Sequence, residues 1–117
     1  MKNVLAERLR RRETFDANCP HRRLLSHITS RWGTLALITM IDGPHRFGAL
    51  KRKMGGITDR MLIKTLHELE KDSMIVRQVY QIMPPHTEYE LTKSGKEAAV
   101  HIENLTDWIA DYLDQQK

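Results

Sequence analysis

The stretch TDRMLIKTLHELEKD, from Thr58 to Asp72, decides the fold of this chain. Side chains in an α-helix are about 100° apart, so a helix over this stretch gathers its leucines on one face. These leucines are Leu62, Leu66 and Leu69. The opposite face carries a basic row: Arg60, Lys64, His67 and Lys71. The pattern predicts an amphipathic helix, capped by Thr58, with one face in a core and the basic face exposed.

The basic row has two interpretations. A helix with a free cationic face fits the major groove of DNA, whose walls are lined by phosphates. Lysine and arginine are also common on ordinary solvated helices, so the row alone does not indicate a partner. The flanking sequence has to decide between these two interpretations.

The residues just before this stretch predict a second helix and a tight turn. Phe47, Leu50 and Met54 recur at spacings of three and four residues, which is typical of a helix of about two turns. Gly55-Gly56 ends it. Its exposed side carries three more cations: Lys51, Arg52 and Lys53. Helix, glycine turn and basic helix in this order is the layout of a helix-turn-helix.

The residues after this stretch change from helical to strand periodicity. Residues 75–82 are rich in β-branched side chains, and residues 88–91 alternate between polar and apolar. Pro84-Pro85 lies between them and cannot continue a central strand, because proline has no backbone N–H to donate. We expect a β-hairpin with a stiff tip, which is the wing of a winged helix.

Two helices are expected before the helix-turn-helix. One begins at Pro20, a residue favoured in the first turn of a helix, and runs to Arg31. The second covers residues 35–41, with Thr34 as its cap. Because it is nearly all apolar, we expect it to be buried in the middle of the domain.

The C-terminal segment, residues 93–117, predicts a long helix with an apolar seam. The seam and its flank comprise Ala98, Ile102, Leu105, Trp108, Ile109 and Tyr112. This stripe is wider than a small winged domain can cover, so we expect it to pack against a second copy of the chain. The alternative is that the helix folds back on its own domain.

Length and composition indicate one globular domain, residues 1–117. From the pattern of elements we expect it to consist of an N-terminal arm (1–18), a DNA-binding core (19–92) and a dimerisation helix (93–117). The net charge is +4, and residues 46–77 hold eight lysines or arginines against four acidic residues. A basic centre favours a polyanionic partner. The N-terminus lacks the apolar segment of a secretory signal, and no apolar run is long enough to cross a membrane, so we expect a cytoplasmic protein.

Four motifs, taken together and in order, resemble the HxlR-type bacterial winged helix-turn-helix regulators. They are Cys19-Pro20, the Gly-Pro-x-Arg-Phe turn at residues 43–47, the Leu-x-x-Leu-Glu-x-Asp run at 66–72, and Pro-Pro followed by Glu-Tyr-Glu-Leu-Thr at 84–92. The resemblance extends from residue 19 to about residue 108. It departs at residues 29–31, where the family usually has Gly-Gly-Lys, and at Ser73, where it usually has glycine.

The resemblance implies a homodimeric, DNA-binding transcriptional regulator that dimerises through its terminal helices. As a repressor or an activator, it would bind a double-stranded operator with inverted half-sites. We expect Thr58, Asp59 and Arg60 nearest the bases. Arg60 is the expected base-reading residue, because a guanidinium can bond guanine at two atoms. Phosphate contacts are expected from the outer edge of the same helix, the preceding helix and the hairpin tip: Lys64, His67, Lys71, Lys51, Arg52, Lys53 and His86.

Catalytic and metal chemistry have little support in the sequence. The histidines show no metal-ligand spacing, there is no phosphate-binding glycine motif, and no cofactor is expected. The single cysteine, Cys19, precedes Pro20 at a helix N-terminus beside basic residues, where a thiolate is stabilised. Cys19 is either a sensor of oxidants or electrophiles, as in some relatives, or a small buried apolar residue.

One rival function belongs to a different class. A winged domain can also be a protein-interaction module, with its basic face turned to an acidic protein instead of DNA. The sequence does not identify an operator, a target gene or a small-molecule effector.

Overall fold

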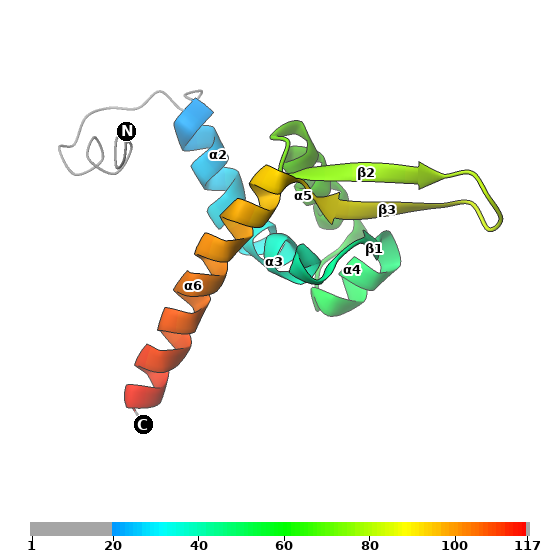
Figure 1. Ribbon diagram of the computed structural model, residues 1–117. Helices are drawn as coiled ribbons and strands as arrows, with labels where there is room; N and C mark the ends of the chain where they lie inside the picture. The colour runs from blue at the N-terminus through cyan, green and yellow to red at the C-terminus, as the bar shows by residue number, and fades with distance from the viewer. Residues whose placement is uncertain (1–19, 117) are drawn as a thin grey trace.

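The computed structural model describes residues 20–116, so the predicted arm, Cys19 and Lys117 lie outside the described part (Figure 1). The elements are α2 (Pro20–Thr29), α3 (Arg31–Thr39), the 3-10 helix η1 (Met40–Asp42), β1 (His45–Arg46), α4 (Phe47–Lys53), α5 (Asp59–Lys71), β2 (Ile75–Tyr80), β3 (His86–Leu91) and α6 (Lys93–Gln115). The fold is mainly helical with a small antiparallel sheet, which confirms the predicted fold class.

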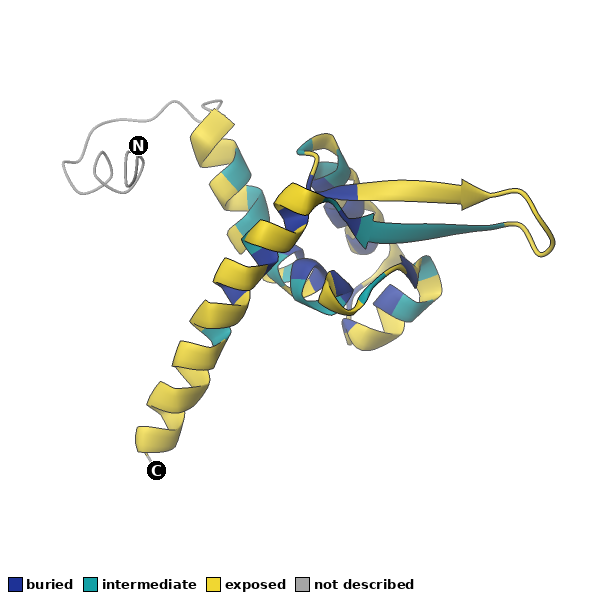
Figure 2. Ribbon diagram, viewed as in Figure 1, coloured by how far each residue is buried: buried dark blue, intermediate teal, exposed yellow. Residues whose placement is uncertain are grey.

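The core lies between the helices and the base of the sheet, with α3 at its centre. α3 packs against α2, α5 and α6. The six largest side chains that are less than 2% exposed lie in this core: Leu37, Met40, Leu50, Leu62, Leu69 and Ile75. Figure 2 shows the same distribution, since the buried positions gather where these helices meet. Burying each such side chain contributes about 1.5–3 kcal/mol, so this cluster holds the helix-turn-helix together.

The predicted helix-turn-helix is confirmed. α4 buries Leu50 and is followed by a turn in which Gly56 has a φ of +88°, a left-handed conformation that favours glycine. Thr58 then caps α5, its Oγ1 accepting the N–H of Met61 at 3.1 Å. The cap and the turn together fix where the basic helix begins.

The predicted wing is also confirmed, but β2 ends at Tyr80 rather than at residue 82, and β3 begins at His86 rather than at residue 88. β2 and β3 pair antiparallel from Ile75 opposite Leu91 to Tyr80 opposite His86. β1 adds a third strand on the other side of β3, so the order is β1-β3-β2. Figure 1 shows the hairpin projecting away from the helices.

Ser73 makes the turn between α5 and β2 without glycine. Its φ is +63°, which places a residue bearing a Cβ in the left-handed region. Thr92, just before α6, holds this turn, since its Oγ1 donates to the carbonyl of Ser73 at 2.7 Å. The same oxygen accepts the N–H of Gly95 at 3.0 Å and so caps α6.

The predicted boundary between the first two helices is wrong. α2 ends at Thr29, and α3 begins at Arg31 rather than at residue 35. The reason is Ser30, whose Oγ accepts the N–H of Gly33 at 3.0 Å and caps α3 early. The segment 35–41 is also less buried than expected, because Leu35 is 40% exposed.

α6 packs on the domain only along its first half, where Ala99 and Ile102 are buried. Beyond these residues the helix projects from the domain, and Figure 2 shows its second half almost wholly exposed. No helix among residues 20–116 combines the length and the apolar character needed to cross a membrane.

Candidate nucleic-acid interface

α5 divides into a buried face and an exposed face, as its sequence predicts. The buried side chains are Leu62, Thr65, Leu66 and Leu69, and Thr65 is held by a hydrogen bond from its Oγ1 to the carbonyl of Met61 at 2.8 Å. The basic row is exposed: Arg60, Lys64, His67 and Lys71. This arrangement leaves the cations of the helix free to meet a polyanion.

An ion pair joins the two helices of the helix-turn-helix. Lys51 Nζ, in the last turn of α4, lies 2.6 Å from Asp59 Oδ1, in the first turn of α5. Asp59 and Lys51 are two of the predicted DNA contacts, and the structure brings them together. Lys51 is therefore paired with a carboxylate and is not an unpaired cation available to a phosphate.

The other two cations of α4 differ from one another. Lys53 Nζ lies 2.8 Å from Nε2 of the buried His45, whose Nδ1 donates to the carbonyl of Gly43 at 2.7 Å. Because a carbonyl oxygen can only accept, Nδ1 carries a hydrogen, and Nε2 accepts from the Lys53 ammonium. Arg52, by contrast, forms no ion pair with any residue between 20 and 116 and is exposed.

His86 lies at the start of β3, next to the tip of the hairpin, and not at the tip itself. Its Nδ1 is 2.9 Å from the carbonyl of Pro84 and its Nε2 is 2.9 Å from Glu88 Oε2. Its ring stacks on Tyr80, with the centroids 4.9 Å apart. Both ring nitrogens are thus occupied, and a phosphate contact by His86 would replace one of these bonds.

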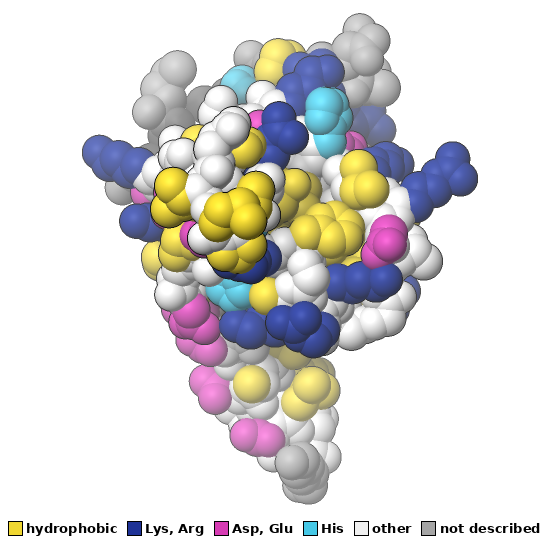
Figure 3. Space-filling model, turned by 90° about the vertical axis from the view of Figure 1, so that its right-hand side faces the viewer, with side chains coloured by type: hydrophobic (Ala, Val, Ile, Leu, Met, Phe, Trp, Pro, Cys, Tyr) yellow, Lys and Arg dark blue, Asp and Glu magenta, His cyan; other side chains and the backbone are white. Residues whose placement is uncertain are grey.

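The tip of the hairpin is apolar. Val79, Ile82 and Met83 are 58%, 74% and 87% exposed, and residues 78–92 contain no lysine or arginine. Figure 3 views the molecule from this end and shows Lys and Arg side chains around a group of hydrophobic ones. Most of the exposed cations in residues 20–116 therefore lie on the helices, while the tip of the wing is apolar.

His27 of α2 bonds to α5 and was missed in the sequence analysis. Its Nε2 lies 3.0 Å from Glu68 Oε2, and its Nδ1 lies 2.5 Å from Asp72 Oδ2. The two carboxylates stand one helical turn apart, at the spacing that places both on one face. That spacing was the available signal, but the sequence does not show which distant side chain meets the pair.

The apolar row on the second half of α6 is exposed. Its members are Leu105, Trp108, Ile109, Tyr112 and Leu113, and each is between 42% and 61% exposed. Trp108 and Tyr112 stack on each other with ring centroids 5.4 Å apart. Of the predicted seam, Ile102 is buried and Ala98 half-buried within the domain. The seam therefore continues from the domain onto a free helix surface.

Residues 20–116 contain no group of three or more histidine, cysteine or acidic side chains that could hold a metal ion. The predicted sensor, Cys19, lies outside this range and immediately precedes Pro20, the first residue of α2.

Comparison with known proteins places this geometry in a family. The chain is 42% identical over 105 residues to YtfH of Escherichia coli K12, described as an uncharacterized HTH-type transcriptional regulator, covering 90% of this chain and 83% of that protein. The solved structure of YtfH from Salmonella typhimurium has a TM-score of 0.77 and 46% identity, over 86% of this chain and 90% of that one. The redox regulator HypR in its reduced form gives a TM-score of 0.74 and 34% identity, over 84% and 97%.

The family model for HxlR-like helix-turn-helix proteins matches residues 27–117. This match covers the helix-turn-helix, the wing and α6. The family consists of DNA-binding transcriptional regulators, and the chain belongs to the HxlR-like helix-turn-helix family.

Proposed function

We propose that the protein acts as a homodimer on an operator, in the cytoplasm, with α5 in the major groove. The observation that carries this proposal is the exposed basic row on a helix whose other face is locked in the core. Thr58, Asp59 and Arg60 stand at the exposed N-terminal end of α5, where recognition helices contact base edges. Arg60 is the principal base-reading residue, because its guanidinium can bond guanine O6 and N7 together.

We propose that basic side chains along α5 and around its N-terminal end bind the DNA phosphates. The basic side chains of the row and of α4 that are unpaired within residues 20–116 serve directly, His67 through its ring N–H: Lys64, His67, Lys71 and Arg52. Lys51, Lys53 and His86 already have partners within the chain, so their contacts with phosphate require an exchange of partner. Each phosphate neutralised releases counterions, which makes affinity fall with salt.

The dimer is proposed to form through α6. Its exposed apolar row continues from the core of the domain, and a contiguous exposed apolar patch is typical of a protein–protein contact. A two-fold axis between two α6 helices would present two α5 helices to successive turns of the major groove. The operator should then carry inverted half-sites with centres about 34 Å apart.

Selection of bound fragments from random genomic DNA tests this proposal. The expected result is enrichment of an inverted repeat with half-sites one helical turn apart, bound by a species of twice 13.7 kDa in light scattering. Retention on heparin without enrichment of any sequence would contradict it. Together with co-purification of an acidic protein, that result would favour the interaction-module alternative.

A redox response through Cys19 is a second candidate function. It is favoured by the similarity to HypR, which is itself described as a redox regulator. Cys19 directly precedes a helix that begins at Pro20, and His21 and Arg22 follow in the first turn. A helix N-terminus and neighbouring cations stabilise a thiolate, the form that reacts with oxidants.

A further inference from the structure

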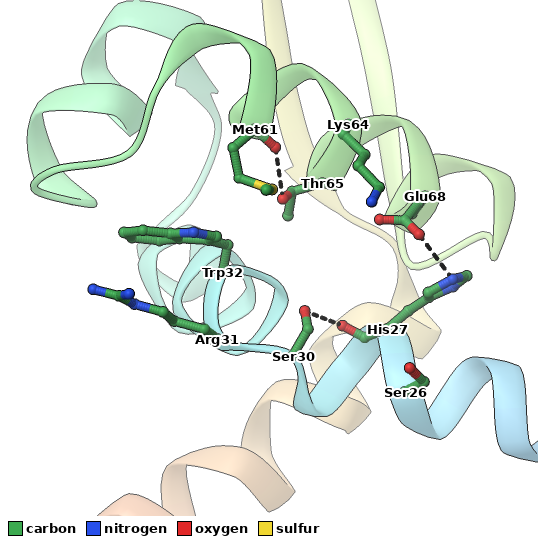
Figure 4. Close-up of a pocket in the computed structure, with 9 residues that line it drawn as sticks. All are labelled: Ser26, His27, Ser30, Arg31, Trp32, Met61, Lys64, Thr65 and Glu68. Atoms are coloured by element: carbon green, nitrogen blue, oxygen red, sulfur yellow. Dashed lines mark hydrogen bonds and ion pairs between the residues drawn. The ribbon is translucent and has the colours of Figure 1, made fainter.

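A pocket of about 300 Å³ lies between the junction of α2 with α3 and the side of α5 (Figure 4). Four of its lining residues come from α5, and the others come from the end of α2 and the start of α3. Small-molecule sites in proteins begin at about this volume. The pocket therefore lies along the side of α5 and shares one residue, Lys64, with the exposed basic row of that helix.

One wall of the pocket is apolar and flat. Trp32 presents its indole ring there, and the guanidinium of Arg31 stacks over that ring, 4.6 Å from its centroid. Figure 4 shows Arg31 on one face of the indole and Met61 of α5 toward the other. An aromatic ring and a thioether together provide dispersion contacts to a planar, apolar molecule.

The charged side chains around the pocket favour an anion. Glu68 is the acidic residue of the lining, and it is already paired with His27 at 3.0 Å. Lys64 is exposed and has no ion pair or hydrogen bond to any residue in the described part of the chain. Arg31 adds a second cation at the rim. A ligand that enters therefore meets one unpaired ammonium and no free carboxylate.

The polar side chains of the lining are largely committed to the protein. Thr65 Oγ1 donates to the carbonyl of Met61, and Ser30 Oγ donates to the carbonyl of His27 and accepts from Gly33 N–H. These bonds leave Lys64, Arg31 and the Ser26 hydroxyl as donors for a ligand, and of the two cations only Lys64 is not stacked on Trp32. A bare phosphate would satisfy Lys64 but would leave the Trp32 wall without a partner.

We propose that this pocket binds a small planar aromatic carboxylate, with its ring against Trp32 and Met61 and its carboxylate on Lys64. The ligand is thus defined by one flat apolar body and one negative group. Binding itself depends only on the pocket and would hold whether or not the chain binds an operator.

Lys64 gives the ligand a route to regulation, a step that rests on the proposed DNA-binding function. The same ammonium belongs to the exposed basic row of α5, where it is a proposed phosphate contact. A bound carboxylate would neutralise its single positive charge, and that charge would then be lost to a DNA phosphate. Ligand binding should therefore weaken DNA binding, and DNA should weaken ligand binding by the same factor.

The binding step is tested by isothermal titration calorimetry on the full chain, with 2-naphthoate as the probe and the neutral 2-naphthamide as its matched analogue. We expect 2-naphthoate to bind one site per chain and the amide to bind about tenfold more weakly or worse, as for loss of a charged hydrogen bond. Lys64→Met and Trp32→Leu should each weaken 2-naphthoate binding about tenfold. The control Lys96→Met, an exposed cation on α6 outside the pocket, should leave it unchanged.

Two outcomes would overturn the site. One is no heat of binding for 2-naphthoate. The other is equal binding of inorganic phosphate and 2-naphthoate with no effect of Trp32→Leu, which would indicate an unspecific anion contact. Circular dichroism of each variant confirms that it is folded, so a loss of binding reports the site.

The regulatory step is tested on a selected DNA fragment, with and without saturating 2-naphthoate. We expect the ligand to lower DNA affinity. The slope of the logarithm of affinity against the logarithm of salt concentration should also fall by about one, as for the loss of one phosphate contact. In Lys64→Met the ligand should have no effect. Ligand binding with unchanged DNA affinity would overturn the competition at Lys64, whereas a wild type that binds ligand but no DNA would contradict the proposed function and leave the pocket intact.

Discussion

Lys51 and Asp59 form an ion pair, with 2.6 Å between Nζ and Oδ1, at the point where α4 and α5 approach each other. Both side chains are largely exposed, so the pair contributes at most about 1 kcal/mol to stability. Its position matters more than its energy, because it holds a negative charge at the end of α5 that is proposed to enter the groove.

Asp59→Asn should therefore strengthen binding to DNA of any sequence. Removing the carboxylate frees Lys51 and eliminates one repulsion toward phosphate, a change of about 1 kcal/mol, or roughly fivefold in affinity at low salt. Fluorescence anisotropy at several salt concentrations measures it, with Asp111→Asn on α6 as the control. If the variant instead loses affinity for the operator alone, Asp59 is a base-reading residue that accepts from cytosine.

Arg60→Ala and Arg52→Ala should have distinguishable effects on DNA binding. Arg60→Ala should cost about 1–3 kcal/mol on the operator and relax the sequence preference at one base pair. Arg52→Ala should lower affinity evenly over all sequences and reduce the salt slope by about one. Competition binding against single-base operator variants measures both. An Arg60→Ala protein with unchanged operator affinity would show that another residue reads the bases.

Ser73→Gly should stabilise the fold by about 0.5–1 kcal/mol. Ser73 occupies the left-handed region at φ +63°, where a Cβ is costly and glycine is not. Urea denaturation measures the change in the free energy of unfolding. Ser73→Ala is the matched control, because it removes the hydroxyl but keeps the Cβ and should not stabilise. Equal stability of the serine and glycine proteins would mean that the turn is not strained.

Trp108→Asp should convert the proposed dimer to a monomer. It places a charge in the middle of the exposed apolar row on α6, which would be desolvated in the interface. Light scattering should show the mass fall from twice 13.7 kDa to 13.7 kDa, while circular dichroism stays unchanged. Glu97→Ala, on an exposed position near the start of α6, should leave the mass unchanged. A Trp108→Asp protein that remains dimeric would place the interface elsewhere.

Cys19→Ser should retain DNA affinity and lose any response to diamide or a quinone. The reason is that the thiolate is the group these reagents attack, and the chain has no other cysteine. Gel shifts of treated and untreated protein measure the response. DNA binding by the wild type that ignores both reagents would end the sensor hypothesis and favour a structural role for the thiol.

The helix-turn-helix and the wing could be predicted because their signals are local. The leucine spacing, the Thr58 cap and the change to strand periodicity each lie within a few residues. The start of α3 is not predicted, because the pair Trp32-Gly33 is typical of a boundary between two helices. In the structure Ser30 caps α3 ahead of this pair. Gly33 is needed there, since a Cβ on it would lie 2.0 Å from the carbonyl oxygen of His27.

The candidate interface was predictable in its residues but not in their pairing. Exposure of the α5 row follows from helical periodicity, and it is confirmed. The contacts of His27 with α5, and those of His86 with its neighbours in the hairpin, depend on tertiary packing or on side-chain rotation. Helical periodicity predicts which side chains are exposed but not which partners they have, and this is why basic side chains of similar appearance in the sequence differ in their availability.

The hydroxyl of Thr92 fastens the base of α6 to the turn that leaves α5. α6 has 23 residues, a length of about 34 Å, and only its first half is anchored in the domain. In the proposed dimer, any rotation of one α6 helix against the α6 helix of the partner would move the attached helix-turn-helix along an arc. The crossing angle of that helix pair would thereby set which half-site spacings the protein tolerates.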